Sequence, residues 1–295
     1  MTRLDDAHRR EQLQDLYRNS KGAVRSTFAS DPGQAAAYYC QLMDFVSRLV
    51  TPGPEKKLLD VGCGSGWSSF EFAKRGFDVT GIDLNPDAFE APADPAYALR
   101  LRAGSATEIP FPDNSFDLVV TYQCLEHVPA PERALDEMTR VCSPGGLVVV
   151  VGPNLLSPVK GLATLCNPRA WSRLQFRRKP ETPMHPYGNT VPEILSVSVR
   201  DMVHLVRKLL RRRPEFLMRS PDLRPPFHAD NDACYLCNPT DLIAYFRDRH
   251  LAIVRRGRHG RPPLSYLFAG GTWVAARTPV QTTNRDGRPI GTGHG

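Results

Sequence analysis

The chain has 295 residues, of which 41% are hydrophobic, so it is long enough to bury a sizeable core, and its formal net charge is +7. No apolar run reaches the ~18 residues of a membrane span, and residues 1–10 lack the apolar core of a secretion signal. The seven scattered cysteines, an odd number, suit a reducing compartment better than a disulfide framework, so we expect a cytoplasmic protein.

The N-terminal part, residues 1–50, is predicted to be helical. Residues 1–28 are charged and helix-prone, and in residues 34–50 apolar side chains recur at spacings of three and four, which is one face of a helix. The simplest interpretation is that this face packs against a sheet. The alternative is a lid over a ligand, in which case Tyr38 or Tyr39 could face that ligand.

Residues 57–69 are the most informative stretch of the chain. The apolar run 58–61, which contains Asp60, is followed at once by Gly62, Gly64 and Gly66, a pattern typical of a buried strand, a tight turn and a helix start. Glycine permits positive φ and removes the Cβ atoms that would keep a ligand away, and the N–H groups of a helix start attract oxygen atoms. The stretch therefore predicts a turn that holds a nucleotide-like ligand.

A second strand is predicted over residues 77–82, and it ends on Asp83. An acidic side chain about 20 residues after a glycine turn, at the end of a strand, can accept both ribose hydroxyls of an adenosine. Asp83 could instead cap a helix. However, Asn85, directly before Pro86, can fill the cap position while Asp83 binds a ligand.

Strands alternate with helices up to residue 151, which predicts a parallel, doubly wound sheet in an α/β fold. Such sheets bind their ligands at the carboxyl ends of the strands. We expect four polar side chains there, namely Asp60, Asp83, Ser105 and Tyr122.

Together these motifs resemble the class I S-adenosylmethionine-dependent methyltransferases, which use Gly-x-Gly-x-Gly where dinucleotide dehydrogenases prefer Gly-x-Gly-x-x-Gly. Position 67, where the dehydrogenase pattern has its third glycine, is Trp67. Four further blocks follow in the order of the family, at residues 104–111, 113–120, 125–129 and 141–150. The resemblance covers residues 57–152 and implies a Rossmann-like sheet of seven strands, methyl transfer, and S-adenosylmethionine as the cofactor.

The resemblance also implies which residues contact the cofactor. The methionine part would be approached by Asp60, Gly62, Cys63, Gly64 and Gly66. The ribose and adenine would be bound by Asp83, Leu84, Ser105 and Ala106, and Tyr122 would lie beside the cofactor. Relatives often carry an aspartate where this chain has Ser105. Because a neutral hydrogen bond replaces a charge-assisted one, we expect adenine selectivity to be weaker by ~1 kcal/mol.

The regular alternation stops after residue 152, and the next clear helix start, at residues 238–241, combines Asn238, Pro239 and Asp241. We interpret residues 51–152 as the cofactor-binding core, 153–237 as a helical insertion after strand five, and 238–277 as the last helix and closing strands of the core. Residues 1–50 would form a lid and residues 278–295 a disordered tail. Because strand five ends at the ligand face, the insertion is the candidate substrate cap.

The insertion is strongly basic, with 13 Lys and Arg residues between positions 153 and 219 against four acidic residues. Within it, Ser198 and Asp201 resemble a capping box that opens a helix, with apolar residues such as Leu209 on one side and Arg207 and Lys208 on the other. The simplest interpretation is a solvated basic face on a packed helix. The alternatives are a peripheral membrane surface or lipid-linked substrate, an acidic or phosphorylated substrate and, least favoured, nucleic acid.

Methyl transfer from a sulfonium depends chiefly on positioning and exclusion of water, but an oxygen or nitrogen acceptor can need a base. His127, just past strand four, is the candidate base, and the alternative is a helix-start histidine bonded to the backbone. His185 and His228, in proline-rich loops of the insertion, are candidate substrate contacts or exposed loop residues. Cys234 and Cys237 form one Cys-x-x-Cys without a second pair, which favours a short buried strand over a metal site.

The sequence thus predicts a methyltransferase that acts on a small molecule or glycoconjugate, at oxygen. One alternative is methylation at carbon of a lipid-like or quinone-like acceptor at a membrane surface. Two alternatives from other classes are a nicotinamide-dependent oxidoreductase, which the glycine spacing disfavours, and a protein that binds S-adenosylmethionine without catalysis.

Overall fold

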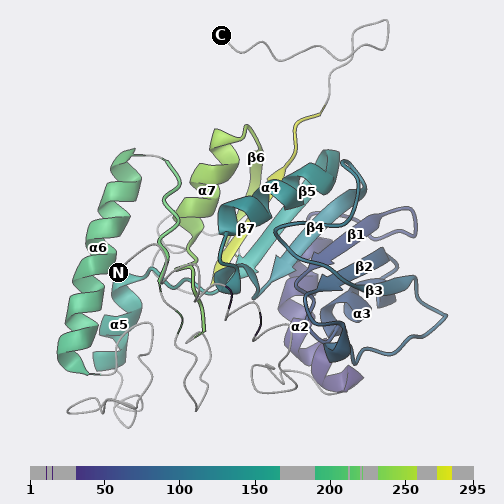
Figure 1. Cartoon of the computed structure of the whole chain (residues 1–295), viewed down its shortest axis with the longest axis horizontal. Coiled ribbons are helices and arrows are strands. Elements are labelled where there is room, and N and C mark those ends of the chain that lie inside the picture. Colours follow the sequence, from purple (N-terminus) through teal and green to yellow (C-terminus); the bar gives the residue numbers. More distant parts are fainter. Residues whose placement is uncertain are drawn as a thin grey trace, which may run out of the picture.

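The computed structural model describes residues 31–166, 190–211, 213–219, 232–257 and 271–280, together with the single residues Glu11, Asp15 and Pro221. A seven-stranded sheet with helices on both faces forms the centre of this part of the chain (Figure 1). The strands are β1 (Lys57–Val61), β2 (Asp78–Asp83), β3 (Leu99–Ala103), β4 (Phe116–Tyr122), β5 (Cys142–Gly152), β6 (Ala252–Arg256) and β7 (Thr272–Arg277).

The strand order is β3-β2-β1-β4-β5-β7-β6, in which the first five strands are parallel and β7 runs antiparallel between β5 and β6. This confirms the predicted doubly wound α/β fold with seven strands. The predicted last strand, residues 266–277, is seen from Thr272 onward, and residues 258–270 lie outside the described part. Because β1, β2, β4 and β5 are parallel, their carboxyl ends meet at one edge of the sheet, where ligands of such folds bind.

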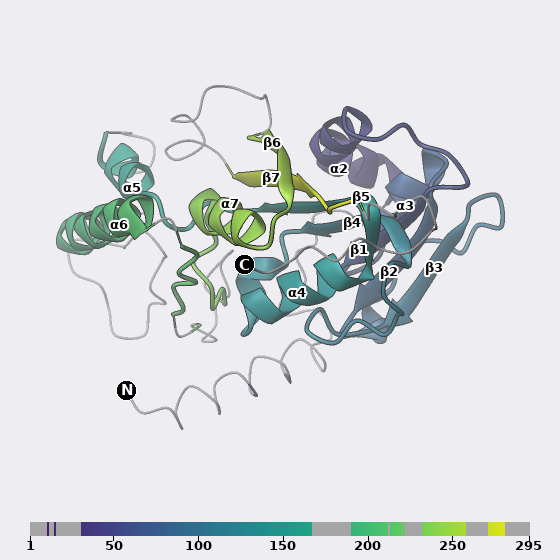
Figure 2. The same cartoon turned by 90° about the horizontal axis from the view of Figure 1, so that it is seen from above.

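Two layers of helices cover the sheet. Helices α2 (Pro32–Ser47) and α3 (Trp67–Lys74) lie on one face, and α4 (Pro131–Val141) and α7 (Pro239–Asp248) lie on the other (Figure 2). The apolar side chains of α2, including Leu42 and Phe45, are buried in one core cluster with Leu58 of β1. Leu59 points to the opposite cluster, beneath α4 and α7, as the alternation of a strand requires. The predicted packing of the N-terminal helix on the sheet is confirmed.

The predicted helix start at Asn238 is confirmed at α7, and α2 begins two residues before the predicted helix of residues 34–50. Asp31 caps α2 by accepting from the N–H groups of Gly33 and Gln34, at 2.9 Å and 3.0 Å. Asn238 caps α7 by accepting from the N–H of Asp241 at 3.0 Å. Both helices carry proline in the first turn, where a missing N–H costs nothing.

Two helices, α5 (Pro158–Leu165) and α6 (Val191–Arg211), belong to the predicted insertion. The predicted capping box at Ser198 is wrong, because Ser198 lies inside α6 and is buried. The capping box is formed instead by Thr190 and Glu193, whose backbone N–H groups each donate to the other's side chain, at 3.1 Å and 3.4 Å. The sequence pattern of a capping box can also occur inside a helix, and the sequence alone does not show where the helix begins.

The predicted apolar residues of α6 do share one side, but the expectation that this side packs and that Lys208 is solvated is wrong. Lys208, expected in solvent, is buried, whereas Leu209 and Leu210, expected to pack, are exposed. Lys208 is buried because its Nζ donates to Oδ2 of Asp241 in α7 at 2.5 Å and to the backbone carbonyl of Glu215 at 2.7 Å. Among the helices that the structure describes, none has the length and apolar character to cross a membrane.

Candidate functional site

The glycine turn between β1 and α3 leaves open space at its middle. Gly62, Gly64 and Gly66 have φ angles of 73°, 55° and 85°, in the left-handed region that favours glycine. A Cβ atom on Gly62 would lie 2.2 Å from Sγ of Cys124, so no larger residue fits there. A Cβ atom on Gly64 would meet no atom within 4 Å, so the backbone at this point faces a space that a ligand can enter.

Asp83, at the end of β2, faces the glycine turn. Its Oδ2 accepts from the N–H of Gly64 at 2.9 Å, and its Oδ1 accepts from the N–H of Asn85 at 3.1 Å. Burial raises the pKa of Asp83 above its usual range, although the backbone N–H groups that it accepts from oppose this shift. Asn85 caps the short helix η1 (Pro86–Ala88), as predicted, so the cap and Asp83 are separate.

Asp60, in β1, is a buried carboxylate with one oxygen unused. Its Oδ2 accepts from the hydroxyls of Ser68 and Ser69, at 2.6 Å and 2.7 Å. Its Oδ1 is buried and has no hydrogen-bond partner among the described residues. Burial raises the pKa of Asp60 to about 6. A buried acceptor without a partner costs free energy, so the site favours a ligand that brings a cationic donor to Oδ1.

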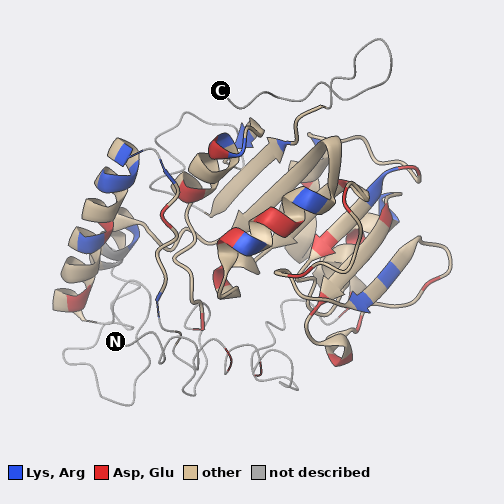
Figure 3. Ribbon diagram, turned by 45° about the horizontal axis from the view of Figure 1, so that its top comes forward, with Lys and Arg blue, Asp and Glu red and all other residues tan. Residues whose placement is uncertain are grey.

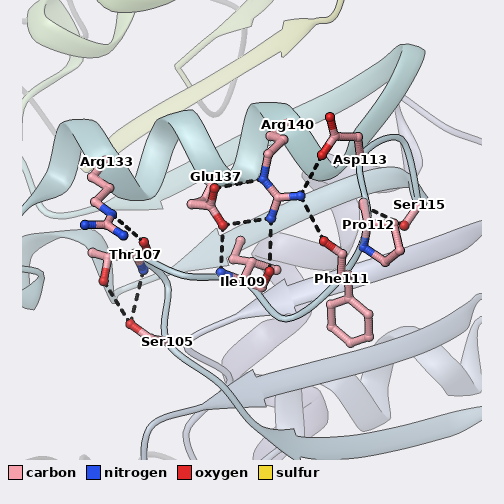
Figure 4. A network of polar contacts seen from close by, with 10 residues as sticks. All are labelled: Ser105, Thr107, Ile109, Phe111, Pro112, Asp113, Ser115, Arg133, Glu137 and Arg140. Carbon is pink, nitrogen blue, oxygen red and sulfur yellow. Dashed lines mark hydrogen bonds and ion pairs between the residues drawn. The ribbon is translucent and has the colours of Figure 1, made fainter.

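The loop from Ser105 to Ser115 is held against α4 by a polar network (Figure 4). The guanidinium of Arg140 donates to the carbonyls of Ile109 and Phe111, at 3.0 Å and 2.9 Å, and to the carboxylate of Glu137 at 2.8 Å. Hydrogen bonds from Arg140 lower the pKa of Glu137. The network therefore fixes the path of the loop that contains the predicted adenine contacts.

Within this loop, the hydroxyl of Ser105 is already engaged. It accepts from the N–H of Thr107 at 3.2 Å and lies 2.9 Å from the Thr107 hydroxyl. Ala106 packs against the core cluster beneath α4, and Leu84, directly after β2, is half-buried. The serine thus shapes its own turn, a role that sequence analysis did not predict.

Three tyrosines cluster at the carboxyl end of β4. The ring of Tyr122 lies 6.0 Å from that of Tyr38 and 5.6 Å from that of Tyr39, measured between centroids. Burial raises the pKa of Tyr122, so it stays neutral. The α2 tyrosines and the predicted site residue Tyr122 therefore share one aromatic wall, which is consistent with both interpretations of α2 as packed helix and lid.

An acid–histidine cluster follows β4 in the short helix η2 (Leu125–His127). Glu126 is fully buried, and Nε2 of His127 lies 3.8 Å from its Oε1. Nδ1 of His127 lies 3.4 Å from Oδ2 of Asp232. The backbone carbonyl of Glu126 accepts from the N–H groups of Cys234 and Tyr235, at 2.9 Å and 3.0 Å. A segment of the predicted insertion is therefore joined to the ligand edge of the sheet.

The Cys-x-x-Cys segment and the two remaining histidines have different outcomes. Cys234 and Cys237 are buried, and Tyr235 between them forms a single bridge with Met218 where a short strand was predicted. His185 and His228 lie outside the described residues. Asp232 was missed as a partner of His127 because the two are far apart in sequence, and no local pattern connects them.

The structure thus brings Asp60, Gly64, Asp83, Tyr122 and His127 to the carboxyl ends of adjacent strands. Cys63 is also buried there, and burial together with Asp60 and Asp83 raises the pKa of its thiol. This edge combines an open glycine turn and a buried acceptor oxygen for a cationic donor. It also carries Asp83, which follows the turn at the sequence spacing of a ribose-binding carboxylate.

Comparison with known proteins agrees with this arrangement. A methyltransferase domain model matches residues 59–150. Over 193 residues the chain is 33% identical to an uncharacterized methyltransferase of Mycobacterium sp. (strain KMS), which covers 60% of this chain and 74% of the relative. Over 97 residues it is 40% identical to the demethylmenaquinone methyltransferase of Renibacterium salmoninarum, which covers 33% of this chain and 41% of that one.

Among solved structures, an S-adenosylmethionine-dependent methyltransferase from Listeria monocytogenes aligns over 83% of this chain and 98% of its own, with a TM-score of 0.52. At 14% identity this likeness concerns the fold alone. The strand order, the glycine turn and the relatives agree with one another. The chain belongs to the class I S-adenosylmethionine-dependent methyltransferases, and S-adenosylmethionine is its cofactor.

Proposed function

We propose that S-adenosylmethionine lies across the glycine turn with its ammonium group on Asp60 and its ribose on Asp83. Two observations support this placement: the free Oδ1 of Asp60 and the open space in front of Gly64. Both carboxylates flank the turn, since Asp83 accepts from the Gly64 N–H. The other proposed contacts are Gly62, Cys63 and Gly66 to the methionine part, Leu84, Ser105 and Ala106 to the adenine, and Tyr122 beside the cofactor.

The bound cofactor supplies a methyl group on a sulfonium, activated for direct transfer to a nucleophile. The protein then has to align the acceptor, exclude water and remove a proton where the acceptor carries one. The aromatic wall of Tyr38, Tyr39 and Tyr122 can exclude water from the strand ends.

We infer that the acceptor is an oxygen of a small molecule or glycoconjugate, with His127 as the general base. The observation that carries this inference is the position of His127 between two carboxylates, 3.4 Å from Asp232 and 3.8 Å from Glu126. With the Nδ1 proton facing Asp232, Nε2 is the nitrogen that would take up the acceptor's proton, 3.8 Å from Oε1 of Glu126. The carboxylates stabilise the imidazolium that results, as in other histidine–carboxylate pairs.

Labelled-methyl transfer from S-adenosylmethionine into a metabolite extract tests the proposal, with the product's carbon-13 methyl shift distinguishing oxygen from carbon attachment. His127→Gln should lower the transfer rate by about 10²- to 10⁴-fold without changing cofactor affinity. Asp232→Asn should have a smaller effect in the same direction. If His127→Gln transfers the methyl group at the wild-type rate, His127 is not the base.

A second candidate is methylation at carbon of a quinone-like or lipid-like acceptor. The Renibacterium salmoninarum relative, named a demethylmenaquinone methyltransferase, favours it, although the chain spans less than half of that relative. A carbon-attached methyl product in the same experiment would replace the oxygen proposal with this one. The predicted substrate contacts His185 and His228 remain predictions.

A further inference from the structure

Helix α6 is fixed to the protein by one of its three sides. That inner side carries the buried residues Ile194, Val197, Asp201, Leu205 and Lys208. The ion pair from Lys208 to Asp241 of α7 and the bond to the Glu215 carbonyl hold it in one rotation about its axis. The direction in which the other two sides face is therefore determined by packing.

The second side of α6, here called the aliphatic face, is exposed along the whole helix. At 3.6 residues per turn its positions form one continuous strip, and these residues are 45% to 78% exposed. The helix has 21 residues, so the strip is about 30 Å long. Exposed apolar surface of this extent marks an interaction site in most proteins. The strip includes Leu195, Val199, Met202, Val206, Leu209 and Leu210.

The third side of α6 borders the aliphatic face with positive charge. Arg207 and Arg211 lie along it with Arg200, which is ion-paired with Asp201, and Glu193 near the helix start is the one acidic residue on it within the described chain. Lys and Arg gather toward the C-terminal end of α6 (Figure 3). Both views of the fold place α6 at the outer side of the described chain, away from the sheet (Figures 1 and 2).

We propose that α6 docks the protein on an anionic lipid bilayer, with the aliphatic face in the headgroup–acyl boundary and the arginines on lipid phosphates. A helix with one aliphatic side and an adjoining basic side has the composition that binds in the plane of such an interface. Long arginine side chains can reach the phosphates while their stems stay in the apolar layer. This inference is independent of the methylated atom.

The charge pattern favours a bilayer over a second copy of the chain. In a symmetric dimer through α6, each aliphatic face would meet the partner's aliphatic face, and both copies would carry the same excess of arginine beside it. Asp201 is buried and neutralises Arg200, so that Arg207 and Arg211 are left in excess and Glu193 is the one other acidic residue of α6. Anionic lipids supply the missing negative charge and a flat apolar layer together.

Vesicle binding of the full chain, measured by co-sedimentation without cofactor or acceptor, tests this proposal. The probes are vesicles of phosphatidylcholine with phosphatidylglycerol and vesicles of phosphatidylcholine alone. The double variant Leu209→Gln, Leu210→Gln should bind the mixed vesicles at least tenfold more weakly. Arg207→Gln with Arg211→Gln should remove the preference for anionic lipid and its loss at high salt.

The matched control is Val280→Gln, at an equally exposed valine after β7, which should bind as wild type does. Since all substituted side chains are exposed, the melting temperatures of the variants should stay close to that of the wild type, which separates docking from folding. The proposal is overturned if the wild type does not bind mixed vesicles, or if the leucine variant binds equally. It is also overturned if the leucines instead hold a dimer, seen by light scattering and lost in that variant.

Discussion

Replacing Asp60 with asparagine tests whether this buried carboxylate strengthens cofactor binding while it lowers the stability of the ligand-free protein. The pKa of Asp60 is raised from 3.8 to about 6 because the group is buried. At 1.36 kcal/mol per pKa unit this corresponds to about 3 kcal/mol. The pKa of Asp60 in the folded protein lies above its pKa in the unfolded chain. The contribution of Asp60 to the unfolding free energy is therefore fully present below pH 4 and is lost as the pH rises through 6. Above pH 6 the charged Asp60 therefore destabilises the ligand-free protein.

Asparagine keeps the acceptor oxygen for Ser68 and Ser69 but carries no charge. The burial of its unpaired amide costs about 1–3 kcal/mol, but that cost does not depend on pH. We therefore expect the unfolding free energy of Asp60→Asn, relative to wild type, to rise by most of about 3 kcal/mol between pH 4.5 and 7.5. Chemical denaturation at a series of pH values measures this difference.

Although Asp60→Asn gains stability relative to wild type as the pH rises, its affinity for the cofactor should be lower than that of wild type. An ammonium on ionised Asp60 makes a charge-assisted hydrogen bond of about 1.5–3 kcal/mol, so Asp60→Asn should bind S-adenosylhomocysteine about 10- to 100-fold more weakly at pH 7.5. Wild-type affinity should fall below pH 6, as Asp60 takes up a proton, and the variant should lack this slope. Calorimetry from pH 5 to 8 measures both.

Asp78→Asn is the control, since Asp78 lies at the beginning of β2, paired with Arg100 on the surface. It should leave affinity and its pH dependence unchanged. The reasoning is refuted if Asp60→Asn binds S-adenosylhomocysteine as tightly as wild type with the same pH slope, because Asp60 would then not face the ammonium group.

Three further predictions concern the cofactor edge and the insertion. Asp83→Ala should weaken S-adenosylmethionine binding at least tenfold, and an unchanged affinity in calorimetry would remove the ribose assignment. Arg140→Ala should release the loop at residues 105–115 from α4, so that calorimetry shows weaker cofactor binding while far-ultraviolet circular dichroism stays that of the wild type; equal affinity would mean that the loop does not shape the adenine site. Lys208→Ala should lower the unfolding free energy by about 3–5 kcal/mol, because Asp241 is left buried without its cation, whereas the pair Lys208→Met, Asp241→Leu should recover most of that loss in urea denaturation. If Lys208→Ala alone is as stable as wild type, the ion pair does not anchor α6.

Local signals in the sequence were sufficient for much of the fold. The strand–turn–helix at residues 57–69, the cap at Asn85 and the start of α7 at Asn238 each depend on a few neighbouring residues. Alternation of strands and helices was enough to predict the parallel sheet, and with it the edge of the sheet at which Asp60 and Asp83 both lie. Such signals are short-range because caps and turns are satisfied within one helical turn.

Only the tertiary structure decided which sides of the insertion are buried. From sequence, the apolar side of α6 was expected to pack and Lys208 to be solvated, but Asp241 and the Glu215 carbonyl give the lysine a buried partner. Likewise, the pairing of His127 with Asp232 joins positions more than 100 residues apart. Periodicity states which residues share a side of a helix, whereas burial depends on what distant segment covers that side, and this is fixed only when the chain has folded.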